Sequence, residues 1–231
     1  MIPQSGTAGF DMLTETFQRA RAFEEDADFV AALRLYHEAY KRDPADLDAI
    51  LGVAQCAMAL DNPELALEFY VKLLILDHGN PWGFLGRAQV MLRYRQFARA
   101  LSDIARAVEL DDPASDFRID CAAALNDCGE PQKALEALAP LGEDFDDDPD
   151  FAAEFIFASI VTDAVDPRAR KMLENCEQTS DDPLFRLCRI AIERQEHPDF
   201  SLPTDEITTI LGAAPDLEFR ATALGLLETA L

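Results

Sequence analysis

The residue patterns that mark enzymes and metal sites are missing from this chain. It has only 10 glycines and three histidines, and no glycine stands in a phosphate-binding loop, a dinucleotide-binding loop or a nucleophile elbow. No two histidines have the i, i+4 spacing of a helical zinc site. Aspartates at 144, 146 and 148 begin like a calcium loop, but Pro149 and Phe155 stand where that loop needs glycine and glutamate. We therefore expect no enzymatic activity, no metal site and no cofactor.

Basic side chains are also scarce, with 20 against 44 acidic ones and a net charge of −24. Residues 1–110 hold 11 basic and 16 acidic side chains, whereas residues 111–231 hold 9 and 28. Such a surface repels phosphate backbones, so we expect no nucleic acid partner. The densest acidic run, 143–150, is interpreted either as a docking surface for a basic partner or divalent cation, or as a solvated loop that favours the next helix start. We favour the solvated loop.

Long apolar runs and paired cysteines are absent as well. No stretch approaches the roughly 20 apolar residues of a membrane helix, and residues 1–10 lack the features of a secretory signal. Five cysteines, none in a Cys-x-x-Cys pair, argue against a disulfide framework or a zinc site. Cys56 and Cys121 are expected to be buried free thiols. We expect a cytoplasmic protein without a membrane segment.

What the chain does contain is a repeat of 34 residues. Alanine followed by leucine stands at 32, 66, 100 and 134, and a second alanine series stands at 20, 54, 88 and 122. Large side chains follow the first series by four residues, at Tyr36, Tyr70, Ile104 and Leu138, which is a same-face helical spacing. A fixed period of this length is typical of stacked helix-turn-helix units. Gly52 and Gly86, also 34 apart, are expected to lie inside helices where two helices approach closely.

The small and large residues of this pattern, with prolines near the unit ends at Pro44, Pro81 and Pro113, resemble the tetratricopeptide repeat family. The resemblance implies an all-α fold, in which antiparallel helix hairpins form a right-handed superhelical array, or α-solenoid. Counting outward from the alanines places four units at 13–46, 47–80, 81–114 and 115–148. We therefore expect a first domain at 1–148, with an N-terminal lead-in before its four hairpins.

The second domain is expected at 149–231, where the alanine series weakens. We expect a degenerate hairpin at 150–177 and a helix from Pro183 to about Gln195. A further helix to Leu211 should have Thr204 as its N-cap, and Pro215 should open a last helix. These acidic helices are expected to continue the array.

The family resemblance also implies a binding site, because four positions of each unit's first helix face a concave groove. We therefore predict a non-catalytic protein-interaction scaffold that binds a partner peptide or protein segment there. The groove residues on this chain would be Phe17, Arg21, Leu51, Gln55, Met58, Trp82, Leu85, Gln89, Leu92 and Ile119. The alternative interpretation is that these side chains pack against neighbouring helices or a capping segment.

The family's clamp for acidic carboxyl termini does not fit this sequence. Phe17, Arg21, Gly52, Trp82 and Gly86 stand where its lysines, asparagines and arginine would be. We therefore expect an apolar or basic partner rather than an acidic one. The apolar C-terminal end is expected to dock on the array or to pair with a second copy as a homodimer.

Two other functions remain open. Residues 66–106 resemble the chaperones of type III secretion translocators, through Leu76-Asp77-His78 and Phe84-Leu85-Gly86 with Tyr70 and Ala88 around them. Alternatively, the chain is a repeat module of a larger bacterial enzyme, such as a sulfotransferase or glycosyltransferase that carries repeats.

Overall fold

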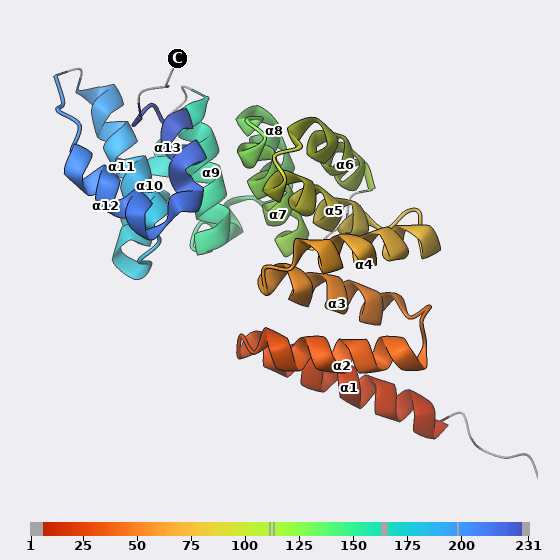
Figure 1. The fold of residues 1–231 in the computed structure, drawn as a ribbon. Helices are drawn as coiled ribbons and strands as arrows, with labels where there is room; N and C mark the ends of the chain where they lie inside the picture. The colour runs from red at the N-terminus through yellow and green to blue at the C-terminus, as the bar shows by residue number, and fades with distance from the viewer. Residues whose placement is uncertain (1–6, 111, 113, 163–165, 198, 228–231) are drawn as a thin grey trace, which may run out of the picture. The chain divides into compact units, whose positions relative to one another are not determined.

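The computed structural model describes residues 7–110, 112, 114–162, 166–197 and 199–227, excepting the side chains of 7–14, 177 and 178. All regular structure among these residues is helical (Figure 1), which confirms the predicted all-α fold. The chain divides into two compact units, Met1–Asp111 (unit 1) and Asp112–Leu231 (unit 2). The division of the repeats at residue 148 remains a prediction.

Unit 1 consists of three helix hairpins in sequence. Its helices are α1 (Thr7–Glu25), α2 (Phe29–Arg42), α3 (Leu47–Ala59), α4 (Pro63–Leu76), α5 (Pro81–Arg93) and α6 (Phe97–Leu110). Each helix packs on the next along the chain. The second and third hairpins begin where the 34-residue count places them, at Leu47 and Pro81, whereas α1 begins six residues before residue 13.

Packing explains why alanine recurs in both series. All eight alanines of the two series are 0% exposed, because facing helices leave no room for a larger side chain. Tyr36 and Tyr70 are also buried, and their rings lie against Gly52 and Gly86. A Cβ atom added at Gly52 would stand 2.5 Å from Tyr36, and one at Gly86 would stand 2.1 Å from Tyr70. The expected close approach at both glycines is confirmed.

The turns inside the hairpins share one backbone conformation. Residues Ala27, Asp61, Arg95 and Gly129, again 34 apart, all have positive φ angles between 55° and 75°. In each turn the next N–H donates to a carbonyl oxygen five residues earlier, as in Asp28 to Phe23 at 2.7 Å. This is the hydrogen bond of a Schellman helix end.

The same period fixes where the first helix of each hairpin begins. Asp46, Asn80, Asp148 and Asp182 are N-cap residues whose side chains accept a hydrogen bond from the helix start, which stabilises the free N–H groups there. Ala114 occupies the third position of this series, between Asn80 and Asp148, and makes no such bond. The start-of-helix period thus extends to Pro183, further than the alanine series indicated.

Unit 2 begins with two hairpins, α7 (Ser115–Asp127) with α8 (Pro131–Leu138), and α9 (Pro149–Val161) with α10 (Pro167–Thr179). Between them lie the short 3-10 turns η1 (Ala139–Leu141) and η2 (Glu143–Phe145). The alanine register slips because residues 162–166 join α9 to α10, where only 128–130 join α7 to α8. Ala169, Leu173 and Cys176 of the late register are nevertheless buried.

The last helices of unit 2 are α11 (Pro183–Glu196), α12 (Thr204–Ala213) and α13 (Glu218–Ala223), with the 3-10 turn η3 (Pro215–Leu217) before α13. Thr204 is not the N-cap as predicted, because the helix already begins there and Pro203 precedes it without a capping bond. Pro215 opens η3 rather than the helix itself. Pro198 and residues 228–231 lie outside the described residues.

Two further expectations concern membranes and thiols. Within the described ranges, no helix combines the length and apolarity needed to cross a bilayer. Cys56 and Cys121 are buried free thiols, as predicted.

Candidate functional site

Four of the predicted groove residues converge on one small pocket in unit 1. Phe17 and Arg21 on α1 and Leu51 and Gln55 on α3 line a pocket of about 120 Å³. The remaining lining comes from Glu24, Tyr36, Asp48 and Gly52. The repeat register therefore brings together side chains from two hairpins that are more than 30 residues apart in sequence.

Glu24, which lines this pocket, is at the centre of a hydrogen-bonded cluster. The Tyr36 hydroxyl donates to Oε2 of Glu24 at 2.7 Å, and the Cys56 thiol donates to Oε1 at 3.6 Å. Burial, reinforced by the Glu24 carboxylate, raises the pKa of Cys56 to about 12 and also raises the pKa of Tyr36. Because the thiol stays protonated near neutral pH, it is a structural hydrogen-bond donor and a poor nucleophile.

The other predicted groove residues lie elsewhere. Met58, Trp82, Gln89 and Leu92 are half-buried on α3 and α5 and do not line the pocket. Leu85 is 1% exposed, so it belongs to the core and has no surface to offer a peptide. The alternative interpretation, that groove positions pack against neighbouring helices, applies to Leu85. For the other four residues the groove assignment stays a prediction.

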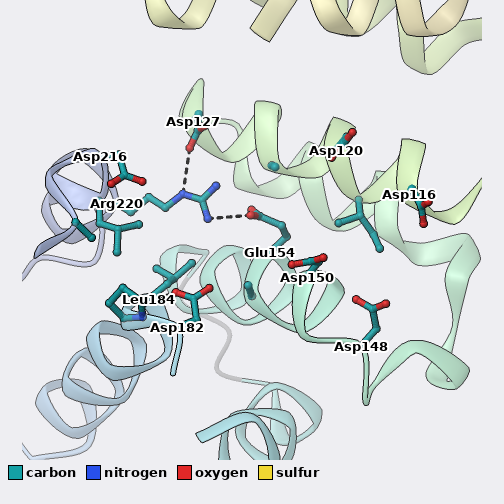
Figure 2. A pocket seen from close by; sticks show the side chains of 16 residues that line it. Asp116, Asp120, Asp127, Asp148, Asp150, Glu154, Asp182, Leu184, Asp216 and Arg220 are labelled. Carbon is teal, nitrogen blue, oxygen red and sulfur yellow. Dashed lines mark hydrogen bonds and ion pairs between the residues drawn. The ribbon is translucent and has the colours of Figure 1, made fainter. Parts of the chain in front are cut away.

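A larger cleft lies in unit 2, and we call it the acidic cleft (Figure 2). It has a volume of about 630 Å³, and its lining includes Ile119, the last predicted groove residue. It is lined by eight carboxylates: Asp116, Asp120 and Asp127 on α7, Asp148, Asp150 and Glu154 at α9, Asp182 before α11, and Asp216 in η3. Apolar side chains such as Leu184 and Leu217 complete the lining.

One basic residue, Arg220 of α13, lines the acidic cleft. Its Nε donates to Oδ1 of Asp127 at 3.0 Å, and its Nη1 donates to Oε1 of Glu154 at 2.9 Å (Figure 2). The guanidinium also lies over the ring of Phe157, 5.1 Å from its centroid. Burial disfavours the charge on Arg220, but Glu154 and Asp127 outweigh burial and raise its pKa.

Glu154 is held from the other side as well. Nδ2 of Asn126 donates to Oε2 of Glu154 at 2.8 Å and to its backbone carbonyl at 3.2 Å. Burial raises the pKa of Glu154, whereas Arg220 and Asn126 act in the opposite direction. The buried carboxylate is thus tied to two donors, as a buried charge requires.

Three other carboxylates of the cleft have no basic partner in the described part of the chain to offset their charge. Among described residues, no basic side chain forms an ion pair with Asp116, Asp120 or Asp150. Burial raises the pKa of Asp120 to about 6, and the carboxylates of Asp116, Asp150 and Glu154 add to the shift. The pKa of Asp150 is raised by burial and neighbouring aspartates in the same way. A positively charged ligand would relieve this mutual repulsion.

The acidic run at 143–150 has mainly local roles. Asp148 accepts a hydrogen bond from the Phe151 N–H at 2.9 Å, which confirms that the run favours the next helix start. Asp146 accepts from Nε of Arg168 at 2.7 Å. Only Asp148 and Asp150 of the run line the acidic cleft. Over the described residues, no group of three or more His, Cys, Asp or Glu side chains is arranged to hold a metal ion.

Sequence reasoning missed most of the acidic cleft. Asp116, Asp120, Asp182 and Asp216 are spread over about 100 residues, and no motif joins them. The only signals were the charge of residues 111–231 and the groove register at Ile119.

Comparison with known proteins agrees with the helical repeat. The family model of the tetratricopeptide repeat matches residues 24–83. No match was found among curated proteins.

Three solved structures share the fold. A thermophilic tetratricopeptide repeat protein of Thermus thermophilus is 19% identical, with 76% of this chain and 95% of that chain covered and a TM-score of 0.60. A tetratricopeptide repeat protein of Parabacteroides merdae is 15% identical, with 96% and 85% covered and a TM-score of 0.57. YrrB, described as having an unusual peptide-binding site, is 20% identical, with 75% and 90% covered and a TM-score of 0.51. Residues 24–83 therefore match the tetratricopeptide repeat model, and the described chain shares the all-α fold of tetratricopeptide repeat proteins.

Proposed function

We propose that this chain is a non-catalytic scaffold that binds a positively charged segment of a partner protein. The acidic cleft is the observation that carries the proposal. Its volume of about 630 Å³ lies within the usual range of ligand pockets. Its carboxylates come from several elements and line one cleft (Figure 2). A rigid helical frame that presents convergent acceptors is suited to recognising lysine and arginine side chains.

Electrostatics supports the same partner class. Residues 111–231 hold 28 acidic and 9 basic side chains, so the field around unit 2 attracts cations. Asp116, Asp120 and Asp150 repel one another in the free protein, and this repulsion is relieved when a cation binds. Binding therefore draws on both long-range attraction and short charge-assisted hydrogen bonds.

The pocket of unit 1 has a different role in this proposal. Phe17 and Leu51 provide apolar contacts, and the Gln55 amide is exposed at the pocket for hydrogen bonding to a peptide backbone. With a volume of about 120 Å³, the pocket is suited to one side chain of a bound segment. YrrB, which shares the fold, is described as having a peptide-binding site.

A matched pair of double variants tests the acidic cleft. The probe is a fluorescently labelled octa-arginine peptide, and the measurement is its dissociation constant by fluorescence anisotropy. Asp150→Asn with Asp182→Asn removes two cleft carboxylates, and Asn at 182 keeps a helix cap. We expect at least about tenfold weaker binding, since hydrogen bonds to charged groups contribute about 1.5–3 kcal/mol each.

The control removes the same charge outside the cleft. Asp147→Asn with Asp181→Asn changes two exposed carboxylates that do not line it. We expect this variant to bind within about twofold of the wild type, because substitution of Asp147 and Asp181 leaves the cleft lining unchanged. An equal loss of affinity in both double variants would show that binding depends only on the net charge of the protein. That result would refute a specific site.

The unit 1 pocket is tested by peptides selected from a random library. Leu51→Asp places a charge against the apolar lining, whereas Ala59→Asp places the same charge on an exposed position of α3. Peptides that use the pocket should lose binding to the first variant and keep binding to the second. If every selected peptide bound both variants equally, the pocket would not be a binding site.

A further inference from the structure

We propose that residues 215–227 are an internal ligand of the acidic cleft, which a basic partner segment displaces. The proposal rests on the proposed function, since it names how the same site is regulated. In this proposal Arg220 competes with a basic side chain of the partner for Asp127 and Glu154.

The position of Arg220 is that of a bound ligand side chain. It reaches the cleft from α13, outside the helix pairs α7–α8 and α9–α10, and places its guanidinium between Asp127 on α7 and Glu154 on α9 (Figure 2). The residue is 8% exposed. Two separate carboxylates and the face of Phe157 contact one guanidinium, and these are the groups that recognise arginine in a peptide.

The rest of the segment is held by few contacts. α13 has only six residues, too few for a helix that is stable by itself. Its anchors include the buried side chains of Ala221, Leu224 and Leu226, together with a hydrogen bond from Arg194 to the Gly225 carbonyl. A segment this short can open without unfolding the helices beneath it.

Arg220 also leaves most of the cleft available. It binds Asp127 and Glu154, whereas Asp116, Asp120, Asp150 and Asp182 line the same cleft without contacting it. A partner segment can therefore bind the open carboxylates first. A second basic residue then competes with Arg220 for Asp127 and Glu154.

Hydrogen exchange of the wild-type protein tests the displacement directly. The probe is an unlabelled octa-arginine peptide, and the readout is the exchange rate of backbone amides at 218–226 by mass spectrometry. Displacement predicts faster exchange of these amides when the peptide is bound. Slower or unchanged exchange with the peptide bound would overturn the proposal.

Removal of the competitor gives a second measurement. Arg220→Gln deletes the charge that occupies the cleft, and Arg186→Gln deletes an equal charge on an exposed part of α11 that pairs with Glu206. If the segment is closed nine-tenths of the time, its release tightens binding about tenfold. We expect this gain for Arg220→Gln only. Equal affinities for the two variants would contradict the internal ligand.

The two proposals fail in different ways. If the wild type and Arg220→Gln both bind octa-arginine with equal affinity and unchanged exchange at 218–226, the internal ligand is wrong and the scaffold function stands. If neither protein binds the peptide, both proposals are wrong. If Arg220→Gln does not fold, exchange in the wild type decides the question.

Discussion

At the scale of single residues, the contact between Gly86 and Tyr70 shows how the repeat selects its glycines. A Cβ atom at Gly86 would stand 2.1 Å from the buried Tyr70 ring, so the ring or the helix would have to move. Gly86→Ala is expected to lower the free energy of unfolding by about 1–3 kcal/mol through overpacking. Urea unfolding followed by circular dichroism measures the change.

A matched control exists in α12. A Cβ atom at Gly212 would have no neighbour within 4 Å. Gly212→Ala is therefore expected to stabilise the protein by about 0.5–1 kcal/mol, because alanine loses less backbone entropy in a helix. Destabilisation of similar size by both substitutions would mean that the tyrosine contact is unimportant.

Asp120 predicts a second residue-scale effect, which depends on pH. Its pKa rises from 3.8 to about 6 in the folded protein, so the folded state keeps a proton that the unfolded state releases. Ionisation of Asp120 therefore lowers the free energy of unfolding as the pH rises from about 4 to about 6. Asp120→Asn should be more stable than the wild type by about 1–3 kcal/mol at pH 7 and nearly equal at pH 4.

Measuring stability over a range of pH values distinguishes the ionisation of Asp120 from other effects of the substitution. Urea unfolding of both proteins between pH 4 and 7.5 should show stability curves that diverge up to about pH 6 and run parallel above it. A constant difference at all pH values would indicate that the amide acts through hydrogen bonding. The same ionisation predicts that octa-arginine binds more tightly at pH 7 than at pH 5.5.

At the scale of helices, the vacant cap at Ala114 gives a test of the start-of-helix period. Ala114 has the extended backbone of an N-cap, with φ −64° and ψ 133°, but no side chain to cap α7. Ala114→Asn restores the residue found at the matching position 80. It is expected to raise the free energy of unfolding by about 0.5–2 kcal/mol. Ala114→Val, which cannot accept the bond, should not stabilise the protein.

The helices were largely predictable from sequence because the repeat has strict packing demands. The starts at Leu47, Pro81 and Ser115 follow directly from counting 34 residues. The cap and proline pairs Asp148-Pro149 and Asp182-Pro183 carried the same period. The expected helices near residue 150 and from Pro183 agree with these starts, but the alanine series alone does not carry the period this far. The short α13 could not be predicted, since its position depends on the distant partners of Arg220.

At the scale of the whole molecule, the net charge of −24 makes binding dependent on salt. Raising the ionic strength from about 0.1 M to about 1 M shortens the screening length from about 10 Å to about 3 Å. Octa-arginine is therefore expected to lose more than about tenfold in affinity to the wild type. Titrations at several salt concentrations check this. An uncharged peptide of the same length is the control, and its affinity should not depend on the salt concentration.

The site was less predictable than the fold. The register placed Phe17, Arg21, Leu51 and Gln55 round one pocket, because helical periodicity decides which side chains share a face. It did not distinguish exposed Gln55 from buried Leu85, since burial depends on neighbouring helices. The cytoplasmic location, a homodimer and the two alternative functions stay predictions.

The left-handed turns inside the hairpins have a consequence for variation among such chains. Ala27, Asp61 and Arg95, with three different side chains, adopt the same left-handed conformation as Gly129, although glycine adopts it most readily. Backbone hydrogen bonding thus dictates the bend, and the side chains there are free to differ in charge. At one of these turns, Asp61 forms an ion pair with Arg93. Each of these turns can therefore vary its surface charge while the two helices that it joins keep their spacing.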